Sequence, residues 1–306
     1  MLSKFIRHFV FSILLLSGKS MWACDVCGCS ISGLQFGILP QFQKHFVGMR
    51  YSTKSFTSIH PPLFTTDSLT TSLESFNTVD LWGRMAISNR WQVFGFLPIN
   101  FIHKVENGIL YDASGLGDVS IVGLYSLINQ KKSKNIPLYQ NLQIGGGIKL
   151  PSGSYQTLDA AKEWIPGVQL GSGSVDFLLN VNYIVKYQHF GASLEANARL
   201  NQQNDLSFKF GNRYASTCKV FYRIDSKKNV IMPNLGLTFE SSNRDYHEGA
   251  FLDLSGGKTL FGQIGVDYFA EHISMGLHYQ PSIYQDVAQG NIISSNRFSA
   301  QILYLF

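Results

Sequence analysis

The chain has 306 residues, of which 13% are aromatic and only 15% are charged, and it contains 28 glycines. This composition comes with little helical periodicity, so it argues against a large soluble enzyme and favours amphipathic strands separated by turns. The formal net charge of +5 falls to +2 if Lys4, Arg7 and Lys19 are removed with a signal peptide, so the basic balance gives no reason to expect a nucleic-acid partner.

The first 23 residues have the pattern of a secretory signal peptide. Lys4 and Arg7 precede an apolar run from Phe9 to Leu16, and a small residue, Ala23, follows a polar stretch. The apolar run is much shorter than the ~20 residues that a membrane-spanning helix needs. The sequence therefore predicts export without a helical anchor, to the periplasm, the outer membrane or the medium.

A cysteine cluster, Cys24, Cys27 and Cys29, opens the segment 24–41 with the spacing C-x2-C-x-C. Thiolates bind soft metals such as Cu(I), or Zn(II), and three sulfurs suit trigonal Cu(I), whereas a closed zinc site needs a fourth ligand. A disulfide or unpaired thiols in an oxidising compartment, and lipidation of Cys24, are the alternatives. We expect no other cofactor. Segment 24–41 is predicted to be a periplasmic tail or a hatch inside a lumen.

From residue 42 onward, apolar and polar residues alternate with the period of a strand. Strands of ten or more residues whose tight and long connections alternate are typical of outer-membrane barrels, whereas a soluble sandwich would turn its polar side outward. The predicted strands are 42–53, 74–88, 91–104, 115–128, 137–150, 174–187, 189–200, 206–225, 230–241, 258–270, 272–281 and 297–306. The predicted long linkers are 54–73, 105–114, 151–173, 242–257 and 282–296.

The last predicted strand carries Phe298, Ala300, Ile302, Tyr304 and Phe306 on one face, which resembles the closing strand of an outer-membrane barrel. We therefore predict an all-β fold, a transmembrane antiparallel up-and-down β-barrel of about 12 strands. It would span residues 42–306 and lie in the bacterial outer membrane. The expected partners are outer-membrane lipid, the barrel assembly machinery and a small-molecule solute.

Three short segments carry a family resemblance: Gly115–Asp118 opens one strand, Gly147–Gly153 closes the next, and Gly171–Phe177 opens another. Their order and spacing resemble the outer-membrane barrels assigned as transporters of the phenol meta-pathway, which are similar in style to fatty-acid channels. The resemblance covers roughly residues 80–306. It implies a barrel that passes small apolar or aromatic compounds.

Charged residues on the polar faces of the strands are the candidates for lining a lumen. A basic face on strand 206–225 would favour anionic solutes; alternatively, these cations pair with inward-pointing acids and help to fill the barrel. The candidate lumen-lining residues are Lys209, Arg213, Lys219, Arg223, Asp176, Glu195 and Asp267.

The sequence offers no catalytic motif. His272, Ser274 and His278 share one face of a strand, but residues two apart on a strand are separated by about 6.5–7 Å, too far for a hydrogen bond between nucleophile and base. We therefore expect a channel or transporter for small molecules and not an enzyme. The alternative is a structural or surface-interaction barrel without a conducting pore, which would use its long linkers as contact surfaces.

Overall fold

The structure, a computed structural model, describes residues 45–60, 70–130, 138–157 and 164–306. The predicted signal peptide 1–23 and the segment 24–41 lie outside the described residues. Within the described ranges, no helix is long and apolar enough to cross a membrane.

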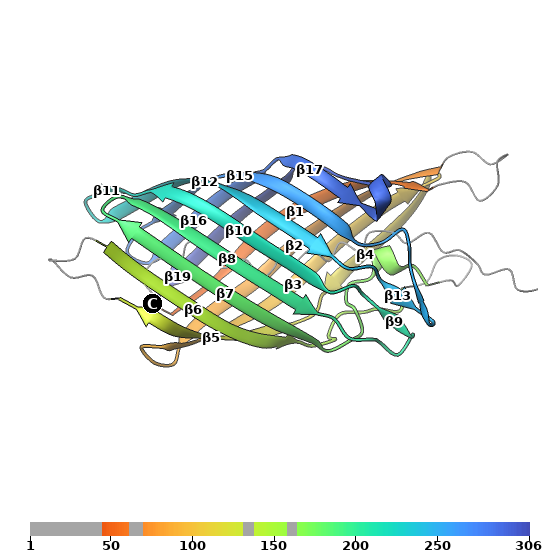
Figure 1. The fold of residues 1–306 in the computed structure, drawn as a ribbon, viewed down its shortest axis with the longest axis horizontal. Helices are drawn as coiled ribbons and strands as arrows, with labels where there is room; N and C mark the ends of the chain where they lie inside the picture. Colours follow the sequence, from red (N-terminus) through yellow and green to blue (C-terminus); the bar gives the residue numbers. More distant parts are fainter. Residues whose placement is uncertain (1–44, 61–69, 131–137, 158–163) are drawn as a thin grey trace, which may run out of the picture.

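Twelve antiparallel wall strands form a closed ring, as predicted (Figure 1). Each strand is hydrogen-bonded to two neighbours, and β1 pairs with β19 to close the ring. The wall is built from β1 (Phe46–His60), β2 (Thr70–Ala86), β3 (Trp91–Glu106), β4 (Ile109–Leu116) with β5 (Ser120–Asn129), β6 (Leu138–Lys149), β7 (Asp176–Tyr187), β8 (Phe190–Leu200), β10 (Arg213–Tyr222), β12 (Asn229–Ser242), β15 (Gly257–Phe269), β16 (Ile273–Gln280) with β17 (Ser282–Val287), and β18 (Ile292–Ser294) with β19 (Arg297–Leu305). The short β11 (Ile224–Ser226) extends the hairpin between β10 and β12.

The alternation of each strand separates an apolar outer face from a mostly polar interior. Leu179, Val220, Leu235 and Ile264 each expose more than half of their side chains on the outside of four different strands. An exposed apolar surface of this extent is the surface that lipid covers in a membrane barrel. Because the ring is closed, the strands around it pair with neighbours on both sides, which removes the open edges that an unclosed sheet would present to lipid.

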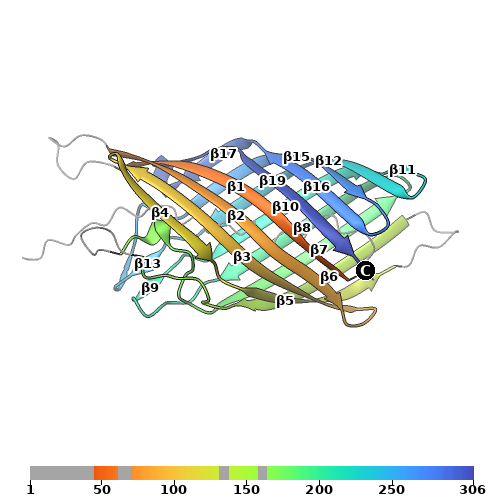
Figure 2. The same ribbon diagram turned by 180° about the vertical axis from the view of Figure 1, so that it is seen from behind.

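The two ends of the barrel differ in their connections. The turn end carries tight connections such as Ser88–Arg90 and Gln188–His189, together with His45 and Phe306, whose backbones are hydrogen-bonded to each other at 3.0 Å. The loop end carries β4 and the longer segments, and it lies opposite the C-terminus in both views (Figures 1 and 2). In outer-membrane barrels the tight turns face the periplasm.

Four predicted linkers prove to be partly strand, namely 54–73, 105–114, 242–257 and 282–296, the last of which contains β17 and β18. Residues 54–60 continue β1, and the predicted linker 105–114 is a tight turn at Asn107–Gly108 followed by β4. Both residues of this turn have positive φ, 50° and 77°, which a type I′ hairpin requires and which Asn-Gly supplies. The alternation continued through these two segments, but their many polar residues had indicated loops.

The predicted strand 206–225 is wrong in its first part. Ser207 has a positive φ of 58°, and the wall strand begins only at Arg213. The preceding residues belong to a small separate sheet at the loop end, made of β9 (Phe208–Lys209), β13 (Tyr246–His247) and β14 (Ala250–Phe251).

Asp245 anchors this loop-end sheet to the barrel. Its carboxylate accepts the backbone N–H of Gly211 at 2.6 Å, and its own N–H donates to Ser255 Oγ at 2.8 Å. The side chain is buried, and burial raises the pKa of Asp245, against the opposing effects of Arg213 and of the Gly211 hydrogen bond.

Apolar side chains inside the barrel gather near both ends and leave the middle polar. Near the turn end, Phe46, Trp82 and Phe94 belong to one buried cluster, and Phe221 and Phe269 belong to another. Near the loop end, a third cluster joins wall residues to inward-folded connections: Phe56, Phe76 and Ile102 with Val168, Ala288 and Ile292. Much of the lumen is therefore filled by side chains of the described residues.

Candidate functional site

The polar interior contains ion pairs between strands. Arg50 Nη2 lies 3.0 Å from Asp80 Oδ2 on the neighbouring strand, and both side chains are buried. Arg297 on β19 reaches Glu240 on β12 at 2.9 Å, although β15 and β16 separate these strands in the ring. Such pairs offset part of the cost of burying charge, and the second also connects distant parts of the wall.

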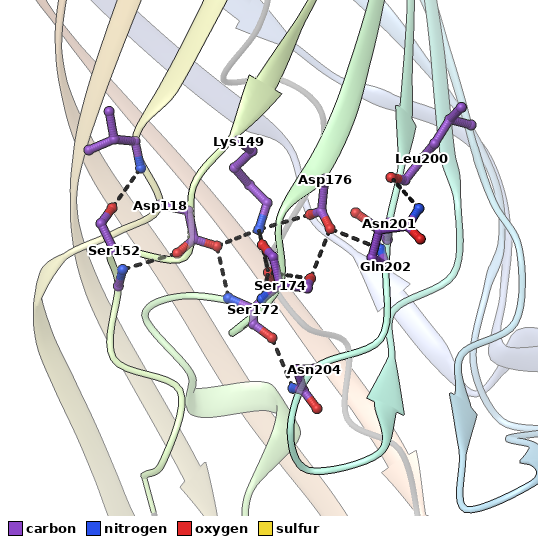
Figure 3. Close-up of polar contacts among 12 residues, drawn as sticks. Asp118, Lys149, Ser152, Ser172, Ser174, Asp176, Leu200, Asn201, Gln202 and Asn204 are labelled. Atoms are coloured by element: carbon purple, nitrogen blue, oxygen red, sulfur yellow. Dashed lines mark hydrogen bonds and ion pairs between the residues drawn. The ribbon is translucent and has the colours of Figure 1, made fainter.

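The three segments that carry the family resemblance meet at one place, which we call the lysine cluster: Asp118, Lys149, Ser172, Ser174 and Asp176 (Figure 3). Lys149 Nζ lies 2.5 Å from Asp118 Oδ2 and 2.8 Å from Asp176 Oδ2. It also donates to the Ser174 carbonyl at 3.2 Å and to the Ser172 hydroxyl. One buried ammonium thus links the β4–β5 junction to the start of β7.

Asp118 also holds two backbone segments in place. Its Oδ1 accepts the Gly153 N–H at 3.0 Å, and its Oδ2 accepts the Ser172 N–H at 2.9 Å. Gly171 is required for this approach, because a Cβ there would collide with the Asp118 carboxylate and would lie 2.7 Å from the Gly153 carbonyl oxygen. The glycines and the aspartate of the motifs therefore serve one tightly packed junction.

The segment 164–175 folds inward at the loop end and contacts the wall. The Gln169 amide bonds to the backbone of Thr157 in both directions, at 3.0 and 2.9 Å, and donates to the Ile165 carbonyl at 2.6 Å. Asn100 of β3 donates to the Leu170 carbonyl at 3.1 Å. Part of the predicted linker 151–173 therefore lines the mouth of the lumen.

Among the described residues, the polar interior contains a larger and a smaller cavity that lie next to each other. The larger, of about 130 Å³, lies beside the lysine cluster and contacts Arg199, Arg213, Asn201 and Phe96, among others. The smaller, of about 40 Å³, lies between β1, β10, β15, β16 and β19. Ser52 and Lys54 border both cavities, so the two spaces adjoin at β1.

Charge is distributed unevenly around these cavities. Their linings together contain seven lysines and arginines and three carboxylates, and none of the carboxylates borders the smaller cavity. Arg199 and Arg213 are direct cross-strand partners and both border the larger cavity. Like charges placed opposite each other destabilise a sheet, so this arginine pair depends on compensating groups nearby, and Arg213 interacts electrostatically with Asp245.

The four basic candidates from the sequence fall into different environments. Arg213 borders the larger cavity and Lys219 the smaller one. Lys209 lies in β9, in the loop-end sheet and not on the wall strand, so the predicted four-residue basic face does not exist. Arg223 lies at the turn end and pairs with Asp225 at 2.7 Å; its hydrogen bond lowers the pKa of Asp225.

The three acidic candidates are all buried in the interior. Asp176 belongs to the lysine cluster, and Glu195 accepts a hydrogen bond from Asn197 at 3.1 Å. Asp267 accepts a hydrogen bond from Asn234 Nδ2 at 2.9 Å, and its carboxylate lies 3.4 Å from His278 Nε2.

Sequence reasoning did not select Lys149, Arg50 and Arg297 as interior cations. All three are buried. Each lies close to an end of its predicted strand, where the alternation that assigns a face is short. The signal that could have identified Lys149 was the presence of an acidic residue, Asp118 or Asp176, in each of the two neighbouring motif segments.

The cysteine cluster Cys24, Cys27 and Cys29 lies outside the described residues, so a metal site there stays a prediction. Among the residues that the structure describes, no group of three or more His, Cys, Asp or Glu side chains could hold a metal ion. Cys218 lies on β10 with its side chain exposed.

Comparison with known proteins identifies the fold. No family model matches the chain, and no curated protein matches it. An outer membrane channel from Pseudomonas putida is similar in structure, with a TM-score of 0.62 and 14% identity over 88% of this chain and 100% of that chain. The beta domain of the Bordetella autotransporter BrkA has a TM-score of 0.48, with 11% identity over 86% of this chain and 100% of that chain. The predicted fold class and the predicted resemblance are confirmed: the chain has the fold of bacterial outer-membrane β-barrels.

Proposed function

We propose that this protein is an outer-membrane channel for small solutes and that it prefers anions. The observation that carries the proposal is the excess of cations around the two interior cavities, seven against three carboxylates. In a low-dielectric barrel, such an excess raises the local concentration of anions and lowers that of cations. The similarity to an outer membrane channel supports this proposal through the fold.

The interior favours charged or polar solutes over the apolar or aromatic compounds that the family resemblance implies. Arg199, Arg213, Lys54 and Asn201 all border the larger cavity, and an apolar solute would have to displace their hydration. The cavity volume of about 130 Å³ also restricts the solute to a few non-hydrogen atoms unless side chains move.

A barrel without a conducting pore is the second candidate. The apolar clusters at both ends favour it, because they fill much of the lumen and because the two interior cavities described above are small. Conduction therefore requires movement of side chains or of segment 164–175. The longer connections at the loop end would then be the contact surfaces.

Planar bilayers distinguish the two candidates. The purified protein is reconstituted, and the reversal potential is measured in a KCl gradient. We expect openings with chloride preferred over potassium, and we expect this preference to fall in an Arg199→Gln, Arg213→Gln double variant. Lys258→Gln is the matched control, because Lys258 is exposed on β15 and borders neither cavity. A folded barrel that never conducts would instead support the second candidate.

A further inference from the structure

The smaller interior cavity is surrounded by cations. Arg50, Lys54, Lys219 and Arg297 border it, together with His278, and its lining contains no carboxylate. All four of these lysines and arginines are at least nine-tenths buried. A buried cluster of like charge is unstable unless something neutralises it.

Three of these four cations, Arg50, Lys54 and Arg297, have interaction partners of their own, and Lys219 is the one without an ion pair among the described residues. Arg50 pairs with Asp80 and Arg297 pairs with Glu240, but neither acid borders the cavity. Lys219 is 5% exposed, and no carboxylate of the described residues lies within ion-pair distance of its ammonium. Its direct neighbours across the sheet are Ser193 and Gly236, neither of which carries charge.

Neutral hydrogen-bond donors complete the lining. Ser52, Ser299 and Gln301 border the cavity, as do Gln263 and Gln280. Gln280 Nε2 donates to Gln263 Oε1 at 3.2 Å, which directs the NH₂ of Gln263 away from Gln280. Hydroxyl and amide N–H groups around buried ammonium and guanidinium groups are the donors that an anion needs to replace its hydration shell.

We propose that this cavity binds one small monatomic anion, of the size of chloride or bromide, and that Lys219 is its principal charged ligand. The volume of about 40 Å³ has room for a monatomic ion, since about 10–15 Å³ of such cavity volume is enough to hold one water molecule. Ser52 and Lys54 also border the larger cavity, which provides the route of exchange. The inference deepens the proposed anion preference, but binding does not require that the barrel conducts.

The test uses the full-length protein purified in detergent. Thermal unfolding is followed while sodium gluconate is replaced by sodium chloride or bromide at constant ionic strength. We expect saturable stabilisation by both halides and none by gluconate, which is too large for the cavity. Lys219→Gln should weaken the apparent halide affinity at least tenfold, Lys219→Arg should retain most of it, and Lys258→Gln should leave it unchanged.

Anomalous diffraction from crystals soaked in bromide locates the ion directly, and it decides the matter if Lys219→Gln does not fold. A bromide peak bordered by Lys219, Arg50 and Arg297 supports the site. Equal halide stabilisation of the parent and Lys219→Gln, or a parent crystal without bromide in this cavity, overturns it. A barrel that binds bromide but is silent in bilayers would refute the proposed channel and leave the anion site standing.

Discussion

The Lys149 ammonium lies 2.8 Å from Asp176 and 2.5 Å from Asp118, so one cation pairs with carboxylates from two segments that are 58 residues apart in the chain. All three side chains are at least nine-tenths buried. This arrangement makes Lys149 the residue on which the loop-end junction depends, because removing it leaves two buried carboxylates facing each other.

Lys149→Met should therefore destabilise the barrel strongly. Breaking a buried ion pair by removing one partner costs about 3–5 kcal/mol, and we expect a loss of this size in the free energy of unfolding by urea in lipid vesicles. Lys258→Met, on the exposed surface of β15, should cost less than about 0.5 kcal/mol. Similar losses in the two variants would show that Lys149 has no special role in stability.

Gly171→Ala should loosen the loop end without unfolding the wall. The new methyl group would collide with the Asp118 carboxylate and the Gly153 carbonyl, so segment 164–175 must shift away from the lysine cluster. We expect faster proteolytic cleavage within this segment and an intact heat-modifiable barrel on gels. Gly95→Ala is the control, because a Cβ at Gly95 would meet nothing within 4 Å. Equal cleavage of both variants would contradict the assigned role of Gly171.

Arginine substitutions on the outer face should report membrane depth. Val181 lies near the middle of β7 with its side chain facing outward, and Val181→Arg should cost about 2–4 kcal/mol if that position is at the bilayer midplane. Leu110 is also exposed, but it lies beside the turn of the β3–β4 hairpin at the loop end. Leu110→Arg should cost about 0–1 kcal/mol. Equal costs in unfolding from vesicles would place the lipid boundary elsewhere.

The loop-end sheet should be more stable in acid than at neutral pH. Burial raises the pKa of Asp245 above its ordinary value of 3.8, so its protonated form is favoured in the folded sheet. The stabilising contribution is complete below the ordinary value and is lost as the pH rises through the raised pKa. We expect proteolysis of residues 243–256, measured from pH 4 to pH 8 with a correction for the protease's own pH dependence, to increase with pH.

Asp245→Asn keeps an oxygen acceptor for the Gly211 N–H and removes the titration, so cleavage of this variant should vary little with pH. Asp253→Asn is a suitable control, since Asp253 is exposed in the same loop and pairs with Arg244. An unchanged pH profile in Asp245→Asn would assign the effect to another group.

The fold could be predicted because a membrane wall imposes a simple rule on every strand. Outward residues such as Leu179 and Val220 must be apolar, so period-two alternation reveals both the strand and its faces. The rule does not apply where the chain leaves the wall. Lys209 continued the alternation of β10, but the left-handed backbone at Ser207 places it in a separate sheet.

The candidate site could be predicted only in its components. The three motif segments were evident, but their meeting at Lys149 depends on the stagger between β5, β6 and β7, which pairs Lys149 with Ser120 and Asp176. Alternation assigns a side chain to a face but not to a height along the barrel. This height decides which acidic side chain meets which basic side chain. The inward folding of segment 164–175 is a second feature that the alternation of apolar and polar residues does not reveal.

The seam between β1 and β19 determines when the barrel can finish folding. Phe46 pairs with Leu305 and Thr53 with Phe298, so the ring closes only after almost the whole chain has been synthesised. Contacts this distant in sequence make folding slow, and until they form both β1 and β16 present open edges to other chains. A chain cut short before residue 297 would lack β19, so β1 and β16 would keep their open edges and the product would be prone to aggregation.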